Sequence, residues 1–145
     1  MTVLSDVRKA SAKFYAALDS LARGDNAAMT RDVWFNGPGA TAQHPVGPRH
    51  RSYKAVLESF AQVGKVATGG EVRLRDQEID AGGDMAVETG TEVGSITIGG
   101  QKVNFELRVT NIYRRDGDSW KIFHHHADPS PAMAAAVDRV MKAHA

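Results

Sequence analysis

The spacing of apolar residues changes its period once along the chain. In residues 7–21 they recur every three or four positions, on the face of a helix that packs inward. A short helix is expected within 25–34, a short strand at 40–43 and another helix over 51–63. From residue 71 the period becomes two, with turn sequences at 81–84, 99–101 and 115–118 that predict antiparallel hairpins. Ser130 and Pro131 then begin a terminal helix, so the order predicts an α+β fold.

The phase of the alternation predicts which residues of strand 103–113 face the helices. Its odd positions are apolar as far as Val109, so Phe105 and Val109 are expected to face inward. Asn111 and Tyr113 then place an amide and a phenol at the end of this apolar face. An apolar cavity with a few polar groups is typical of a small-molecule pocket. A packed core with hydrogen-bonded polar residues at its edge explains the same pattern.

The preceding strand, 85–93, has its more apolar residues at odd positions too. We therefore expect Thr89 and Thr91 to face inward, and Glu88 and Glu92 to face outward. This phase leaves the interior without a carboxylate from these two strands.

Three consecutive histidines, His124, His125 and His126, lie in the last strand, 120–126, whose two faces both carry apolar residues. A β-bulge could reverse its faces midway, so which histidines face the cavity stays open. Histidines two apart on a strand can bind a metal, with His44 as a third ligand. Because no carboxylate is expected there, we favour structural or pocket-lining histidines and predict neither a metal site nor a cofactor.

His44 follows the expected strand 40–43 and precedes a proline. It is either a plain loop residue or a general base, because histidine titrates near neutral pH. Phe14, Tyr15 and Trp34 are candidates for the same pocket, although aromatic residues at helical spacing also form ordinary cores.

Composition narrows the classes of function. The chain has 145 residues, a net charge of +1 and no cysteine. The balanced charge gives no reason to expect nucleic acid or a membrane surface as a partner, and the missing cysteines exclude disulfides and thiol chemistry. With no signal peptide and no apolar run of membrane-spanning length, we expect one cytoplasmic domain over 1–145.

Three stretches carry a family resemblance: FYAALDSLARGD (14–25), ATAQHPVG (40–47) and RRDGDSWKIFHHHADPSPA (114–132). They resemble the nuclear transport factor 2-like superfamily, in its branch of SnoaL-like and calcium/calmodulin-dependent-kinase-association-like domains. The resemblance implies a cone-shaped fold in which a strongly curved antiparallel sheet wraps around N-terminal helices. It also implies an internal pocket and a homodimer formed through the sheet.

The same resemblance bears on the chemistry of the pocket. His44 stands where related ketosteroid isomerases have an aspartate base, Asn111 where they have an acid, and Phe14 where they have a tyrosine. These three differences argue against steroid isomerisation. We expect a domain that binds a mostly apolar small molecule. In one version of this hypothesis the domain is also a weak isomerase, dehydratase or cyclase that uses His44, Asn111 and Tyr113. The alternative is a non-catalytic association module with a vestigial pocket.

Overall fold

The computed structural model describes residues 2–143. Its helices are α1 (Val3–Ala22), α2 (Tyr53–Val66), α3 (Pro131–Ala143) and the short 3₁₀ helix η1 (Ala28–Thr30). Its strands are β1 (Thr41–Gln43), β2 (Arg49–Arg51), β3 (Ala67–Gly82), β4 (Met85–Ile98), β5 (Gln101–Asp116) and β6 (Ser119–Ala127). The fold is α+β, as the change of period predicts.

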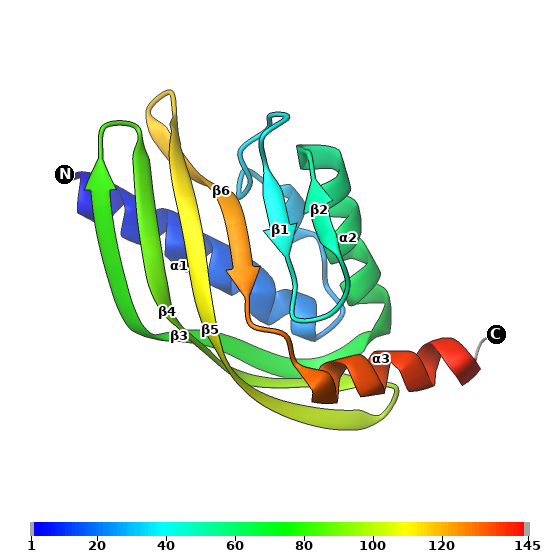
Figure 1. Ribbon diagram of the computed structural model, residues 1–145. Helices are drawn as coiled ribbons and strands as arrows, with labels where there is room; N and C mark the ends of the chain where they lie inside the picture. Colours follow the sequence, from blue (N-terminus) through cyan, green and yellow to red (C-terminus); the bar gives the residue numbers. More distant parts are fainter. Residues whose placement is uncertain (1, 144–145) are drawn as a thin grey trace.

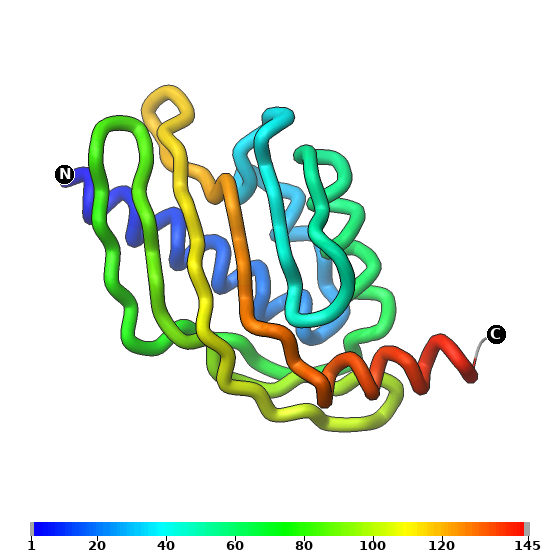
Figure 2. The backbone as a smooth tube through the Cα atoms, in the orientation of Figure 1, coloured from blue at the N-terminus to red at the C-terminus, as the bar shows by residue number. Residues whose placement is uncertain are grey.

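The strands form one curved, open sheet in the order β2-β1-β6-β5-β4-β3. All neighbours are antiparallel except β1 and β6, which run parallel. Figure 1 shows α1 crossing behind the sheet, α2 beside β2, and α3 at the lower end. In Figure 2 the lower parts of β3, β4 and β5 bend sharply toward α3.

Helix α1 lies against the sheet because one of its faces is mainly apolar. Val7, Phe14, Leu18 and Leu21 are buried in the core with aromatic residues of α2 and the segment before β1. The hydroxyl of Thr2 accepts from the backbone N–H of Ser5 and caps the first turn. This helix therefore supplies one wall of the interior along its whole length.

Helix α3 covers the other end of the interior. Met133 and Ala136 pack in a second apolar cluster with Ile96, Val103 and Leu107 from the bent parts of β4 and β5. The helix begins with the Ser130 hydroxyl accepting from the N–H of Met133, as its Ser-Pro start predicts.

Two strand features differ from the sequence-based expectation. Strand β2 is not among the expected elements, and its backbone pairs with β1. The parallel pairing of β1 with β6 is equally unexpected, because it joins segments about 80 residues apart that no hairpin links. The short helix expected within 25–34 is reduced to η1.

No helix in the described part of the chain is both long and apolar enough to cross a membrane.

Strands β3 and β4 approach closely at two glycines. A Cβ at Gly94, whose φ is +156°, would lie 1.9 Å from the carbonyl oxygen of Glu71. A Cβ at Gly70, with φ +138°, would lie 2.1 Å from the carbonyl oxygen of Ser95. These contacts involve backbone atoms, so a side chain at either position forces the two strands apart.

We predict that Gly94→Ala lowers the free energy of unfolding by about 2 kcal/mol or more, because it combines backbone strain with a steric clash. Urea denaturation followed by circular dichroism measures this loss. Gly82→Ala is the matched control in the same strand pair, because a Cβ there meets nothing within 4 Å. Equal stability losses in the two variants would contradict the prediction.

Candidate functional site

A cavity of about 120 Å³ lies between α1, α2, α3 and the curved sheet. Its walls are mainly aliphatic and aromatic, with Leu18, Phe60, Ile96, Leu107 and Met133 contributed by five different elements. An apolar cavity of on the order of 150 Å³ takes a benzene-sized molecule. The size and lining therefore suit a compact hydrocarbon body.

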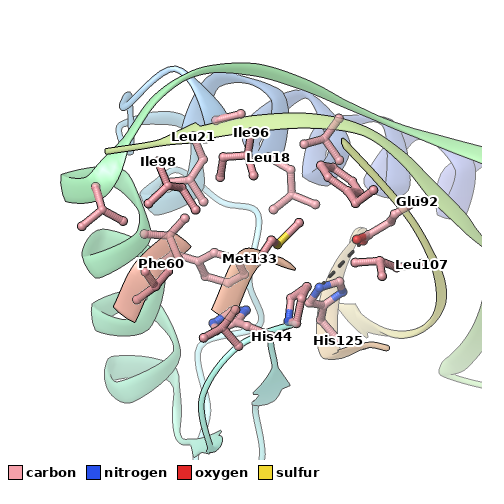
Figure 3. Close-up of a pocket in the computed structure, with 18 residues that line it drawn as sticks. Leu18, Leu21, His44, Phe60, Glu92, Ile96, Ile98, Leu107, His125 and Met133 are labelled. Carbon is pink, nitrogen blue, oxygen red and sulfur yellow. Dashed lines mark ion pairs between the residues drawn. The ribbon is translucent and has the colours of Figure 1, made fainter. Parts of the chain in front are cut away.

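The cavity's polar groups gather at one end. Of the side chains that line it, His44, Glu92 and His125 carry titratable groups, and Figure 3 shows them together beside Leu107. The ring centres of His44 and His125 are 6.3 Å apart. Nε2 of His125 lies 3.8 Å from Oε1 of Glu92. A small molecule at this end contacts groups from three separate segments.

Glu88 and Glu92 face inward, so the sequence-based phase of β4 is wrong. Glu88 is fully buried and Glu92 is 5% exposed, whereas Thr89 is exposed. The physical cause is the turn between β4 and β5: Ile98 pairs with Gln101 across only two residues. That register pairs even positions of β4 with odd positions of β5, and directly opposite residues share a face.

The turn itself is a sequence signal for Glu92 that the hydrophobic pattern outweighed. Gly99 and Gly100 have φ values of +59° and +79°, as a two-residue hairpin turn with both central residues left-handed requires. Taking Gly99-Gly100 as that turn pairs Glu88 with Asn111 and Glu92 with Leu107. Both carboxyls then follow the inward face of β5.

Glu88 is held by three hydrogen-bond donors behind the cavity. Its Oε1 accepts from the Tyr113 hydroxyl at 2.7 Å and from Nδ2 of Asn111 at 2.9 Å. Its Oε2 accepts from Nε2 of Gln77 at 2.7 Å, and that amide also contacts Ser11. Buried carboxylates are stable only when hydrogen-bonded in this way. Asn111 and Tyr113 thus serve this network and do not line the cavity.

Glu92 has a different environment. Its Oε1 accepts from the Tyr15 hydroxyl at 3.0 Å, and that hydroxyl accepts from Nδ2 of Asn111 at 2.9 Å. Burial raises the pKa of Glu92 to about 7, against the lowering effect of the Tyr15 hydrogen bond. Burial and the neighbouring Glu92 also raise the pKa of Tyr15, which keeps its proton. Glu92 can therefore hold or release a proton near neutral pH.

Both cavity histidines are neutral. Burial lowers the pKa of His44 to about 4, helped by the nearby His50. Burial also holds the pKa of His125 well below its usual range, with His44 adding to the effect. The contact between His125 and Glu92 drawn as a dashed line in Figure 3 is therefore not an ion pair at neutral pH. Each ring keeps one nitrogen lone pair, so each can act as a base.

Strand β6 brings one of its three histidines into the cavity. Ile112 pairs with His124 but Tyr113 pairs with Ile122, so Phe123 is the extra residue of a bulge. The bulge reverses the faces of β6 and turns His125 inward. His124 instead contacts the hydroxyl of Thr41 through Nδ1 at 2.7 Å, and His126 is exposed.

The aromatic residues expected in the pocket have different places. Phe105 lines the cavity. Phe14 and Trp34 are buried in the core, where the Phe14 ring packs 5.1 Å from the ring of His125. Tyr15 reaches the site through its bond to Glu92.

Two expected pocket residues lie elsewhere. Thr89 and Val109 border a separate surface groove together with Arg108 and Asp128, so neither lines the cavity. Among residues 2–143, no group of three or more His, Asp or Glu side chains is arranged to hold a metal ion.

Comparison with known proteins places the chain in a family. A family model of the SnoaL-like domain matches residues 7–133. The chain therefore belongs to the SnoaL-like domain family. No curated protein gives a match.

Solved structures share the fold. A protein from Streptomyces avermitilis, described as a candidate dehydratase of the nuclear transport factor 2-like family, is 26% identical with a TM-score of 0.75, covering 88% of this chain and 96% of that one. A candidate calcium/calmodulin-dependent protein kinase type II association domain from Thiobacillus denitrificans is 24% identical, with a TM-score of 0.66 and coverage of 83% and 92%. The hub of that kinase from S. rosetta is 20% identical, with a TM-score of 0.64 and coverage of 87% and 95%.

The raised pKa of Glu92 predicts how stability changes with pH. A carboxyl whose pKa rises from 4.5 to about 7 on folding stabilises the fold below pH 4.5 relative to pH 7, and this stability is lost as the pH rises through about 7. We predict that Glu92→Gln gains about 3 kcal/mol relative to the native chain between pH 4.5 and pH 7.5. Urea denaturation at both pH values measures the difference.

Glu106→Gln is the control, because this carboxyl is exposed on the outer face of β5. A gain of similar size in Glu106→Gln, or a pH-independent difference for Glu92→Gln, would contradict the assignment.

Proposed function

We propose that the protein binds a compact, uncharged and mostly apolar small molecule and catalyses proton transfer on it, as an isomerase or dehydratase does. The observation that carries this proposal is the grouping of two neutral imidazoles and one protonatable carboxyl at one end of an apolar cavity. An acid and a base with separated pKa values in one mainly apolar site are typical of general acid–base catalysis. The family membership and the likeness to a candidate dehydratase support it.

The roles follow from the protonation states. His44 or His125 takes a proton from carbon, because each ring is neutral and keeps a lone pair. Glu92 in its protonated form donates to the substrate oxygen on which negative charge develops or which leaves as water. Nothing in the cavity lining carries a fixed positive charge to meet a carboxylate or phosphate, so an uncharged substrate is preferred.

Hydrogen–deuterium exchange at the carbons beside the carbonyl of cyclohexanone tests this chemistry without knowledge of the natural substrate. We predict that the native protein accelerates this exchange, measured by proton NMR in D₂O. The double variant His44→Gln/His125→Gln is expected to lower the protein-catalysed exchange rate by about 10²-fold or more. The exchange rate is expected to stay level between the pKa of His44, lowered to about 4, and that of Glu92, raised to about 7.

Above that range the rate falls as Glu92 loses its proton, and below it the rate falls as the base becomes protonated. The matched control is His124→Gln, a neighbouring histidine on the opposite face of β6. No acceleration by the native protein, or the same loss in His124→Gln, would count against the proposal.

We further propose that the protein forms a homodimer through the outer face of its sheet. The likeness to an association domain and a kinase hub supports self-assembly. Val87 is 43% exposed and Met85 is 40% exposed on β4, which is a suitable surface for burial by a second copy.

Sedimentation velocity at micromolar concentration is expected to show a dimer, which Val87→Glu converts to monomer by placing a charge in the contact. Leu4→Glu, at an equally exposed apolar residue on α1, is the control and keeps the dimer. A native monomer at these concentrations would rule the homodimer out.

A further inference from the structure

In the hydrogen-bond network behind the cavity, Glu88 determines which groups donate and which accept. Three side-chain donors, from Gln77, Asn111 and Tyr113, surround its two oxygens, and both oxygens act as acceptors. Glu88 is fully buried, and both of its oxygens accept hydrogen bonds from these side chains. Each partner must therefore turn an N–H or O–H toward it.

This requirement fixes the orientation of the Asn111 amide. Its Nδ2 donates to Oε1 of Glu88 and to the hydroxyl of Tyr15, both at 2.9 Å. An amide nitrogen has two hydrogens, so both are used. The opposite orientation would place the amide oxygen against the Glu88 carboxylate, with two acceptors facing each other. The Asn111 oxygen is thus left for His125.

The orientation of Asn111 in turn selects the tautomer of His125. Nδ1 of His125 lies 2.7 Å from Oδ1 of Asn111. An oxygen that has no hydrogen needs a donor at that distance, so Nδ1 carries the ring proton. In a neutral imidazole the other nitrogen is then bare. That atom, Nε2, is the one 3.8 Å from Glu92 at the polar end of the cavity.

We propose that Glu88 and Asn111 are positioning residues, which hold His125 with a bare Nε2 toward the cavity so that it accepts from an O–H or N–H group of the ligand. This inference rests on the proposed function for the ligand, but the tautomer follows from the network alone. Glu88 touches neither cavity nor ligand and acts through Asn111. The ligand class is an uncharged, ring-sized molecule that carries a hydrogen-bond donor at one end.

Nitrogen-15 NMR of histidine-labelled protein tests the tautomer directly. We expect Nδ1 of His125 to resonate as a protonated ring nitrogen and Nε2 as a bare one. Glu88→Gln keeps the shape of the side chain but can turn its own N–H₂ toward Asn111, so the amide can reverse and the tautomer with a proton on Nε2 appears. A protonated Nε2 in the native protein, or an unchanged tautomer in Glu88→Gln, would overturn the inference.

Gln77→Ala is the matched control for the network. It removes a donor from the other carboxylate oxygen, Oε2, and leaves the contact between Glu88 and Asn111 in place. The native tautomer is expected in this variant. A reversed tautomer in Gln77→Ala would show that any disturbance of the network has the same effect, which would also overturn the assignment to Glu88 and Asn111.

Three ring-matched probes test the ligand class: cyclohexanol, methylcyclohexane and cyclohexanecarboxylate. We expect cyclohexanol to shift the Nε2 signal and to bind about 2- to 10-fold more weakly to Glu88→Gln, the range for loss of one hydrogen bond. Methylcyclohexane is expected to leave the Nε2 signal unchanged, and cyclohexanecarboxylate not to bind. A bare Nε2 without binding of any probe would refute the proposed function while supporting the positioning role. Cyclohexanol binding that leaves the Nε2 signal unmoved would overturn the ligand contact.

Discussion

Two carboxyl groups inside the curved sheet are the constraint on which the rest of the interior depends. An ionised carboxylate buried without partners costs many kcal/mol, so the surroundings of Glu88 and Glu92 have to supply donors or a proton. At Glu88 they supply three donors from β3 and β5. At Glu92 one phenol donates, and burial raises the pKa to about 7. One carboxyl is thereby anchored, and the other is left able to exchange a proton.

Helix α1 serves both environments with one face, because residues three or four positions apart point the same way at successive levels along the helix axis. Ser11 and Tyr15 contribute hydroxyls to the network, while Leu18 and Leu21 line the cavity one and two turns later. The middle of α1 thus contacts the hydrogen-bonded network around Glu88, and its last turns line the apolar cavity. A change in its register would disturb both, which ties the stability of the fold to the geometry of the site.

Local sequence patterns predict the helices and strands well, but predict less well which side chains of a strand point toward the core. The apolar stripe of α1 and the turn sequences of β3–β6 are confirmed, because each depends on residues close in sequence. The facing of β4 is wrong because Met85, Val87 and Val93 suggest a buried odd face, while the Gly99-Gly100 turn sets the opposite register. The bulge at Phe123 and the parallel pairing of β1 with β6 depend on contacts distant in sequence, which periodicity does not encode. The chemistry of His44 made it a candidate from the sequence, whereas Glu92 was missed because the hydrophobic pattern of β4 outweighed the register that the Gly99-Gly100 turn indicates.

The titratable groups of the cavity are neutral because burial disfavours the charged form of each of them. His125 has an amide oxygen and a mostly apolar surrounding, and Glu92 has no cation beside it, so each group lowers its cost of burial by staying uncharged. A neutral imidazole and a protonated carboxyl that contact the same bound molecule can exchange protons with it without creating a net charge in the cavity. A lysine or arginine beside these groups would add a fixed positive charge, and the cavity would then no longer be neutral during proton exchange. The absence of a fixed charge from the cavity lining is therefore the feature that fits its three titratable groups to the proposed proton transfer.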